Sequence, residues 1–600
     1  MALVMERPGP TLRLGGRLSR QWPLLPALVF VAVFLILPVA QLLALSFLTK
    51  DGGALTPDHY LRLFESPIYL QVLANSFKVA ALTTVICLVG GFPVAYLLAN
   101  LSDSLRGTLL IWVLLPLWTS FLIRSIAWVI LLTGKGVINS ALVGAGIVDQ
   151  PVRLLYNFIG LMIGTAQGLM PVAVMMMLSV MMGIDRNLMK AAQTLGARPA
   201  NQFWRIYVPL ALPGMAAGAL VVFVSALGLF VTARLLGGPR DIMLSLLIIQ
   251  QFEEVYDLNF AAVLSMILLA STLVVVLLFD RVLGLSAFTG EAAGARGKKR
   301  SPNRPSRRLG LAMVAALGWF FSTIGELRDR VFRLSPRATS APGPFLWVVA
   351  LVVVFFIAAP TFILLPASIS RSNFLSWPPV GFTLDWYAEF FTDPAWRNAL
   401  IRSVLIGIAT AFVAMGLGIP AAYVLGKQAV PGRSLIMTGL LMPVVLPSII
   451  VGVGLFYLYS RVGLLQTSIG LILGHTVFAL PYVVVTTMAA LRAYDQRLDH
   501  AAWTLGAGKL TTFRLVSFPL MKAGMASAFL FAFVHSFDEL SVALFVTGPN
   551  TPTLPKRLWS ETLYKLDPSV AAAASIIVLI VAVPIFLSQI LLSRKARGRR

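Results

Sequence analysis

Long apolar stretches recur along this chain, and they limit what it can fold into. Each stretch is about 20 residues or longer and carries few charges, so a helix over it could cross the ~30 Å hydrocarbon core of a bilayer. Only 12% of the residues are charged and 58% are hydrophobic, which excludes a water-soluble globular fold. The sequence predicts an all-α membrane protein with about 12 transmembrane helices, near residues 24–47, 75–99, 107–132, 157–182, 207–233, 259–280, 344–368, 399–425, 434–459, 466–490, 516–546 and 570–592.

One polar sequence occurs twice in the chain. AAQTLGARPANQFWRIYVPLALPGM begins at Ala191, and AAWTLGAGKLTTFRLVSFPLMKAGM begins at Ala501. The two copies, 310 residues apart, share Ala-Ala, Thr-Leu-Gly-Ala, a Phe, Pro-Leu and Gly-Met at the same positions. Earlier in each half, PVAY at 93–96 matches PAAY at 420–423, at a spacing of 327. Similarity of this kind indicates internal duplication.

The duplication divides the chain into two homologous six-span halves. We assign residues 1–285 to the first half, 286–343 to a basic linker and 344–600 to the second half. The change in spacing places about 17 extra residues in the first half, most simply in the loop GKGVINSALVGAGIVDQPVR, because loops tolerate insertions. Within the linker, LGLAMVAALGWFFSTIG is short and bordered by charge, which favours a helix on the membrane surface over a thirteenth span.

The net charge of +24 lies mostly in short runs beside the apolar spans. This placement argues against nucleic acid as a partner and indicates orientation in a lipid membrane. Basic runs precede the first span, fill the linker and follow the last span, so the positive-inside rule places both termini and the linker in the cytoplasm. We therefore predict a multi-pass protein of the bacterial cytoplasmic (inner) membrane, with both repeated segments in the cytoplasm and the acidic loop QQFEEVYDLN outside.

The sequence contains no cluster of residues suited to catalysis. Cys87 is the single cysteine, and the four histidines lack metal-ligand spacing. No Gly-Lys pair is followed by Ser or Thr, so a phosphate-binding loop of the Walker type is missing. We predict no catalytic residues, no metal and no cofactor in this chain.

Each repeated segment is predicted to begin with a short helix. Asp185 and Asp495 are suitable N-caps, and Gly196 and Gly506 can end the helices in a left-handed turn. The apolar face of each helix consists of Leu and Ala at helical spacing. Such a face on a single loop is typical of a helix that merely links spans, but its duplication favours a docking surface for a partner.

The repeated motif resembles the EAA signature of the permease subunits of ABC-type importers. The Glu that precedes Ala-Ala in that family is Lys190 in the first half and His500 in the second. The resemblance implies that these loops are coupling helices, each seated in a groove of one of two ATP-hydrolysing subunits. It also implies two fused permeases that receive a small-molecule solute from an extracytoplasmic solute-binding protein. The positions that match are Ala191, Ala192, Gly196, Ala197, Phe203 and Pro209, and Ala501, Ala502, Gly506, Ala507, Phe513 and Pro519.

Three further segments look most like the two permeases of spermidine/putrescine importers. They are SFLIRSIAWVILL in the first half, with GHTVFALPYVVVT and SFDELSVALFVTGPNTPTLPKRLWS in the second. This resemblance implies import of a polyamine. Ferric iron or a small organic anion is an alternative solute, because importers of these solutes share much of the pattern. An ATP-independent carrier built from two repeats is a further alternative.

Ionisable residues inside predicted spans are candidates for the solute pathway. A charge in hydrocarbon is costly and is normally kept where a cavity or a partner compensates it. Asp538 and Glu539 fall in the fifth span of the second half, and Arg124 falls in the third span of the first. One carboxylate could instead neutralise Arg124 or His535 between the halves.

We also predict a vestibule at the outer end of this pathway. Trp559 and Tyr564 would supply aromatic walls for a polyamine, and Glu561 would supply a carboxylate. The acidic loop with Glu253, Glu254 and Asp257 would attract cations through its field.

The charge pattern makes a prediction about topology. A reporter fused after Arg300, and another fused after Arg600, should each report a cytoplasmic location, because both follow basic runs and an even number of spans. Paired alkaline phosphatase and fluorescent protein fusions measure this. A phosphatase signal at Arg300 would contradict six spans in the first half.

Overall fold

The computed structural model describes residues 21–49, 54–283, 319, 323, 343–374, 377–428, 430–495, 497–565 and 567–597. These residues are almost entirely helical, and the β contacts among them are two isolated bridges, Leu48–Leu55 and Ser370–Phe382. The predicted all-α class is therefore confirmed. The predicted surface helix in the linker lies outside the described residues, apart from Trp319 and Thr323.

The helices of the two halves follow one another in a similar order. The first half contains η1 (Trp22–Leu24), α2 (Leu25–Val31), η2 (Ala32–Ile36), α3 (Leu37–Leu45), α4 (Asp58–Glu65), α5 (Pro67–Asn100), α6 (Asp103–Leu114), η3 (Leu115–Trp118), α7 (Phe121–Leu132), α8 (Val137–Gly144), α9 (Phe158–Met181), α10 (Asn187–Thr194), α11 (Pro199–Asn201), η4 (Gln202–Tyr207), α12 (Val208–Gly228), α13 (Val231–Leu236), α14 (Leu244–Glu253) and α15 (Leu258–Leu283). The second half contains α17 (Pro344–Ser368), α18 (Asp385–Thr392), α19 (Pro394–Lys427), α20 (Arg433–Val445), α21 (Ser448–Val462), α22 (Ser468–Ala493), α23 (Arg497–Thr504), α24 (Lys509–Thr512), η7 (Phe513–Ser517), α25 (Phe518–Phe537), α26 (Ser541–Val546), α27 (Leu554–Tyr564) and α28 (Pro568–Arg597).

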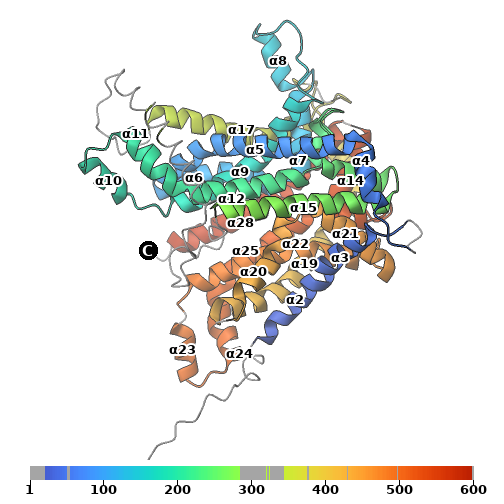
Figure 1. Cartoon of the computed structure of the whole chain (residues 1–600). Helices are drawn as coiled ribbons and strands as arrows, with labels where there is room; N and C mark the ends of the chain where they lie inside the picture. Colours follow the sequence, from blue (N-terminus) through green and yellow to red (C-terminus); the bar gives the residue numbers. More distant parts are fainter. Residues whose placement is uncertain are drawn as a thin grey trace, which may run out of the picture.

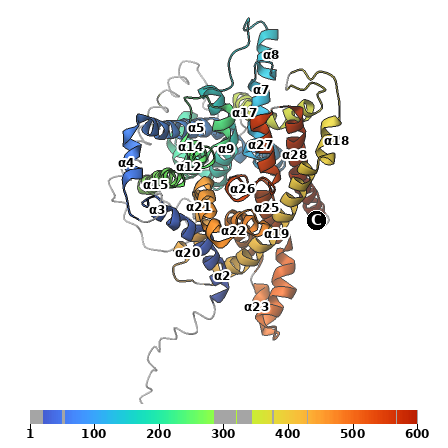
Figure 2. The ribbon, with the colours of Figure 1, turned by 90° about the vertical axis from the view of Figure 1, so that its right-hand side faces the viewer.

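Each half is built around three long helices that pack against one another. These are α5, α9 and α12 in the first half and α19, α22 and α25 in the second. The two groups lie side by side, blue to green and yellow to orange in Figures 1 and 2. The same arrangement in both halves is the structural form of the duplication.

A glycine at the same position in each half permits close packing of the first two of these helices. A β-carbon on Gly91 of α5 would lie 3.1 Å from Val174 of α9, and one on Gly418 of α19 would lie 2.8 Å from Val483 of α22. Small residues at such crossings allow the helix backbones to approach, because lipid tails are as apolar as the side chains and close contact must drive association.

The first span of each half packs against the other half. Helix α3 lies against α21 of the second half, and α17 lies against α5 and α7 of the first. A β-carbon on Gly454 of α21 would come within 3.0 Å of Pro38 in α3. The halves are therefore joined by an exchange of helices.

The predicted spans agree with the helices in position. Ten helical segments among the described residues are long and apolar enough to cross a membrane, and the bent pair α20 and α21 raises the number to 11. Helix α28 covers the last predicted span. Every one of the twelve predicted spans thus overlaps helices of the structure.

Two spans in each half are interrupted, although we had predicted continuous helices there. The third span breaks between α6 and α7 in the first half, and α20 and α21 meet at a bend of 96° in the second. The fifth span breaks after α12 and after α25. Hydropathy did not reveal these breaks, because the broken segments remain apolar; Pro116 and Pro447 mark the two breaks in the third spans.

The loop that holds the extra residues of the first half contains α8, which projects from the body of the molecule (Figure 1). Asn139 closes the loop, since its side-chain amide donates to the carbonyls of Thr133 and Val152 at 3.0 Å each. The loop contacts the second half, where the amide of Trp377 donates to the carbonyl of Lys135 at 2.9 Å.

The crossing of α19 and α22 generates a stability prediction. Gly418→Ala should lower the melting temperature of the purified protein, because the new β-carbon overlaps Val483, and overpacking costs about 1–3 kcal/mol. Gly416→Ala is the matched control on the same helix: no atom lies within 4 Å of its β-carbon position, and alanine favours a helix by up to about 1 kcal/mol. Equal melting temperatures for the two variants would contradict the packing argument.

Candidate functional site

The breaks of the two halves meet at the interface between them. A β-carbon on Gly228, at the end of α12, would lie 3.1 Å from Pro447, in the bend between α20 and α21. In the duplicated sequence, Asp538 aligns with Gly228 and Ser120 aligns with Pro447. Asp538 follows α25, Ser120 precedes α7, and these two side chains also interact. The third-span break of each half therefore contacts the fifth-span break of the other, and one of the two contacts is polar.

The polar contact includes Arg124, which is 5% exposed. Its guanidinium donates through Nε to the carbonyl of Ser120 at 3.3 Å and through Nη1 to the carbonyl of Gly168 at 3.0 Å. It also lies 4.2 Å from the ring centroid of Phe121. Ser120 caps α7, because its hydroxyl accepts from the amide of Ile123 at 3.0 Å.

The two adjacent carboxylates of the second half have different surroundings. Glu539 is 7% exposed, and its Oε2 accepts from the amides of Val542 at 2.8 Å and Ala543 at 3.3 Å, so it caps α26. The same oxygen lies 3.6 Å from Nε2 of His475. Asp538 is partly exposed and lies in the field of Arg124. Asp538 is thus the more accessible of the two carboxylates, and Glu539 caps a helix.

The location of these carboxylates corrects our prediction in one respect. We placed both inside a continuous fifth span, but α25 ends at Phe537 and the two residues form the turn before α26. Ser120 and Gly168, which complete the site, were not predicted. The sequence feature that could have indicated these two residues is Arg124, because a buried guanidinium requires carbonyl or carboxylate acceptors nearby.

The residues predicted as a vestibule do not gather into one. Trp559 is 3% exposed and packs edge-to-face on Phe230 at 5.7 Å, whereas Tyr564 is 90% exposed. Glu561 pairs with Arg557 at 2.6 Å, one turn earlier on α27. Aromatic walls and a free carboxylate around one cavity are therefore not found among these residues.

The acidic loop is also more neutral than predicted. Asp257 pairs with Arg62 at 2.9 Å and caps α15 through the amide of Phe260 at 3.1 Å. Glu254 lies 3.6 Å from Arg234. Basic side chains of neighbouring elements compensate these two carboxylates, which weakens the acidic field that we predicted for the loop.

The repeated segments form two similar helices, α10 and α23, at the end of the molecule where the C-terminal helix α28 ends (Figure 1). The predicted left-handed turns are confirmed, since φ is +82° at Gly196 and +83° at Gly506. In each turn the next amide donates back into the helix, from Ala197 to the carbonyl of Ala192 at 2.9 Å and from Ala507 to that of Ala502 at 3.0 Å. These bonds satisfy carbonyls at the helix end.

The repeated Phe residues attach these segments to the long helices. Phe203 packs edge-to-face on Tyr96 at 5.4 Å, and Phe513 packs on Tyr423 in the same way at 5.9 Å. Both lie in π-helical turns, η4 and η7, just before Pro209 and Pro519. A wider turn suits this place, because proline lacks the amide hydrogen and its ring clashes with an ordinary preceding turn.

One face of each repeated helix is exposed. Leu195 and Leu505 are 88% and 87% exposed, and Leu188 and Leu498 are both 46% exposed. Ala192, which we had placed on the docking face, is only 9% exposed and turns toward the chain itself. The exposed apolar surface therefore centres on the two leucines that precede the glycine turns.

Among the described residues, no group of three or more His, Cys, Asp or Glu side chains is placed to hold a metal ion. Cys87 is buried in α5.

One protein family matches most of both halves. Its description is binding-protein-dependent transport system inner membrane component, and the matches cover residues 91–286 and 414–598.

Similar proteins include two kinds of permease. The spermidine/putrescine transport system permease protein PotB of Salmonella typhimurium (strain SL1344) is 36% identical over 244 residues, which are 40% of this chain and 85% of that protein. The corresponding protein PotC of Haemophilus influenzae is 32% identical over 245 residues, which are 41% of this chain and 94% of that protein. A solved bacterial alginate ABC transporter, in complex with alginate pentasaccharide-bound periplasmic protein, is similar with a TM-score of 0.40 and 22% identity, covering 45% of this chain and 96% of that one.

Proposed function

This chain belongs to the family of binding-protein-dependent transport system inner membrane components, the permeases of ABC importers, and we propose that it carries a polyamine such as spermidine or putrescine into the cytoplasm. Two permease proteins of spermidine/putrescine systems, PotB and PotC, resemble it at 36% and 32% identity. Because the chain contains two family matches, it supplies both permease halves of the importer.

The proposed solute rests on the position of Asp538, whose carboxylate lies where the fifth-span break of the second half contacts the third-span break of the first. Asp538 is partly exposed, and its neighbour Arg124 is buried. A polyamine carries several ammonium groups, each of which can donate hydrogen bonds to this carboxylate. An anion would need Arg124 instead, but two of its donors already bond to carbonyls and its face lies on Phe121. The site therefore favours a cation over an organic anion.

The proposed partners dock at opposite ends of the molecule. Helices α10 and α23 present equivalent exposed leucines, which suit the grooves of two ATP-hydrolysing subunits on the cytoplasmic side. The opposite end carries α4 and α8 and would receive the solute-binding protein (Figure 1). This orientation is the one that the basic runs predict, with the linker and both termini in the cytoplasm.

The docking proposal is tested at Leu195 and Leu505. Changing either to Asp should reduce ATP-driven uptake at least about tenfold, because loss of about 1.4 kcal/mol of binding corresponds to that factor. The adjacent exposed residues provide matched controls, Thr194→Asp and Thr504→Asp, which add the same charge beside the apolar surface. Copurification of the ATP-hydrolysing subunit and uptake into proteoliposomes are measured together. Normal copurification with both leucine variants would contradict the proposal.

The solute proposal is tested at Asp538. Asp538→Asn should lower polyamine uptake at least about tenfold while the complex assembles and hydrolyses ATP, because the change removes charge but little volume. Glu561→Gln should have a smaller effect, since Glu561 already pairs with Arg557. Uptake of radiolabelled spermidine by the reconstituted complex is the measurement. Normal uptake by Asp538→Asn, or transport of an anion that depends on Arg124, would show that the cation pathway is wrong.

The same assay separates an ABC importer from an ATP-independent carrier. Proteoliposomes that contain the chain without the ATP-hydrolysing subunit should not accumulate spermidine. Uptake at the full rate without ATP would overturn the energy coupling proposed here.

A further inference from the structure

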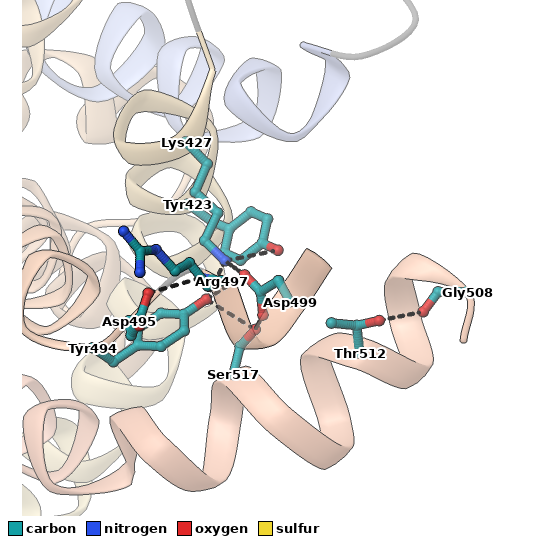
Figure 3. Close-up of polar contacts among 9 residues, drawn as sticks. All are labelled: Tyr423, Lys427, Tyr494, Asp495, Arg497, Asp499, Gly508, Thr512 and Ser517. Atoms are coloured by element: carbon teal, nitrogen blue, oxygen red, sulfur yellow. Dashed lines mark hydrogen bonds and ion pairs between the residues drawn. The ribbon is translucent and has the colours of Figure 1, made fainter. Parts of the chain in front are cut away.

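A buried polar cluster joins α23 to three long helices of the second half. Its members are Lys427 at the end of α19, Tyr494 just after α22, Asp499 in α23 and Ser517 at the end of η7, and we call them the Asp499 cluster (Figure 3). Asp499 accepts from Lys427 and Tyr494 at Oδ2, and from the hydroxyl of Ser517 at Oδ1 over 2.9 Å. One carboxylate thus connects the cytoplasmic ends of α19, α22 and α25 with the docking helix.

The cluster is withdrawn from solvent. The side chain of Asp499 is 3% exposed and that of Lys427 is 10% exposed. Burial opposes ionisation of Asp499, yet the hydrogen bonds from Lys427, Tyr494 and Ser517 hold its pKa below the usual value. Lys427 also lies over the ring of Tyr423, at 4.5 Å from the centroid. A buried, fully bonded ion pair of this kind is strongly destabilised when one partner is lost.

Among its described residues, the first half has no such cluster. The residues aligned with Lys427 and Asp499 are Asn100 and Met189. Asn100 donates to the carbonyl of Tyr96 in its own helix at 2.8 Å, and Met189 carries no charge. The residue aligned with Ser517 is Tyr207, which packs on Tyr96 at 4.9 Å. Aromatic packing replaces the ionic cluster.

A hydrogen bond attaches the start of α10 to its own half. The guanidinium of Arg186, just before α10, donates to the carbonyl of Ala99 at 2.6 Å. This bond reaches a single helix, α5, whereas the Asp499 cluster reaches three. Apolar packing is non-directional and permits small shifts, while an ion pair with three donors fixes one geometry.

The two halves also differ at the far ends of the same helices. Helix α25 begins next to Ser517 and ends next to Asp538, the carboxylate proposed to receive the solute. Helix α12 of the first half ends at Gly228, which has no side chain to offer. The half with the ionic attachment is therefore the half whose fifth span leads to the charged site.

We propose that the Asp499 cluster locks α23 to α19, α22 and α25, so that movement of the ATP-hydrolysing subunits reaches the solute site through the second half. Helix α10, which the hydrogen bond of Arg186 attaches to α5, follows its own half more loosely. The four residues are positioning residues, because they contact neither the solute site nor the exposed leucines. This inference rests on the proposed function, in which the ATP-hydrolysing subunits dock on α10 and α23.

The test uses the full chain assembled with its ATP-hydrolysing subunits and the solute-binding protein. Asp499→Asn and Lys427→Met should each lower the number of spermidine molecules imported per ATP hydrolysed by about tenfold, a typical size for coupling between sites. The reversed pair Lys427→Asp with Asp499→Lys should recover most of that ratio. Met189→Leu, at the aligned position of the first half, is the matched control and should leave the ratio unchanged.

A second measurement does not depend on transport. Hydrogen exchange of the full chain in lipid nanodiscs should show the amides of 497–504 exchanging about tenfold faster in Asp499→Asn, with 187–194 unchanged. A purely local packing role would not be rescued by charge reversal, so the reversed pair should also restore slow exchange.

The outcomes separate this inference from the proposed function. A wild-type import ratio and unchanged exchange in both Asp499→Asn and Lys427→Met would overturn the role of the cluster. Loss of copurification with the ATP-hydrolysing subunits in these variants would also overturn it, because the residues would then act in docking. Uptake by the wild-type complex without ATP would refute the proposed function, and the exchange measurement would still decide whether the cluster holds α23.

Discussion

Backbone groups inside a bilayer have no water to bond, so a helix that breaks within the membrane must be covered by protein. This chain breaks four of its spans and places the breaks against one another, third span of one half on fifth span of the other. Side chains satisfy the freed groups: Glu539 accepts from two amides of α26, Arg124 donates to the carbonyl of Ser120, and Ser245 donates to that of Leu229 at 2.7 Å. The exchange of α3 and α17 between the halves joins the two halves firmly around these contacts.

The duplication produces two equivalent contacts between a third-span break and a fifth-span break, and the two contacts differ in chemistry. One brings together Gly228 and Pro447, which add no charge, and the other brings together Ser120 and Asp538 beside Arg124. The same half that holds Asp538 also holds the ionic Asp499 cluster at the opposite end of α25. A symmetric scaffold thus carries an asymmetric charge pattern.

Some features of the repeated segments, which contain α10 and α23, were predictable from the sequence motif and others were not. The helix ends at Gly196 and Gly506 were predictable, because helices commonly end in a left-handed turn and glycine adopts that conformation without strain. The roles of Phe203 and Phe513 were not, since a phenylalanine beside a surface helix could face a partner or the protein. The structure directs both inward onto equivalent tyrosines, leaves Leu195 and Leu505 outward, and turns Ala192 toward the chain.

The sequence by itself determined the class of protein, the duplication, the positions of the spans and the helix stops, because each depends on local composition, on spacing or on self-similarity. Only the tertiary structure decided where the spans break, that Glu539 is a helix cap while Asp538 stays accessible, and that Trp559, Glu561 and Tyr564 do not share a cavity. It also decided that Lys427 and Asp499 meet, although two complete spans and their loops separate them. Such contacts depend on how apolar helices pack, and hydropathy is the same for a helix face whichever neighbour covers it.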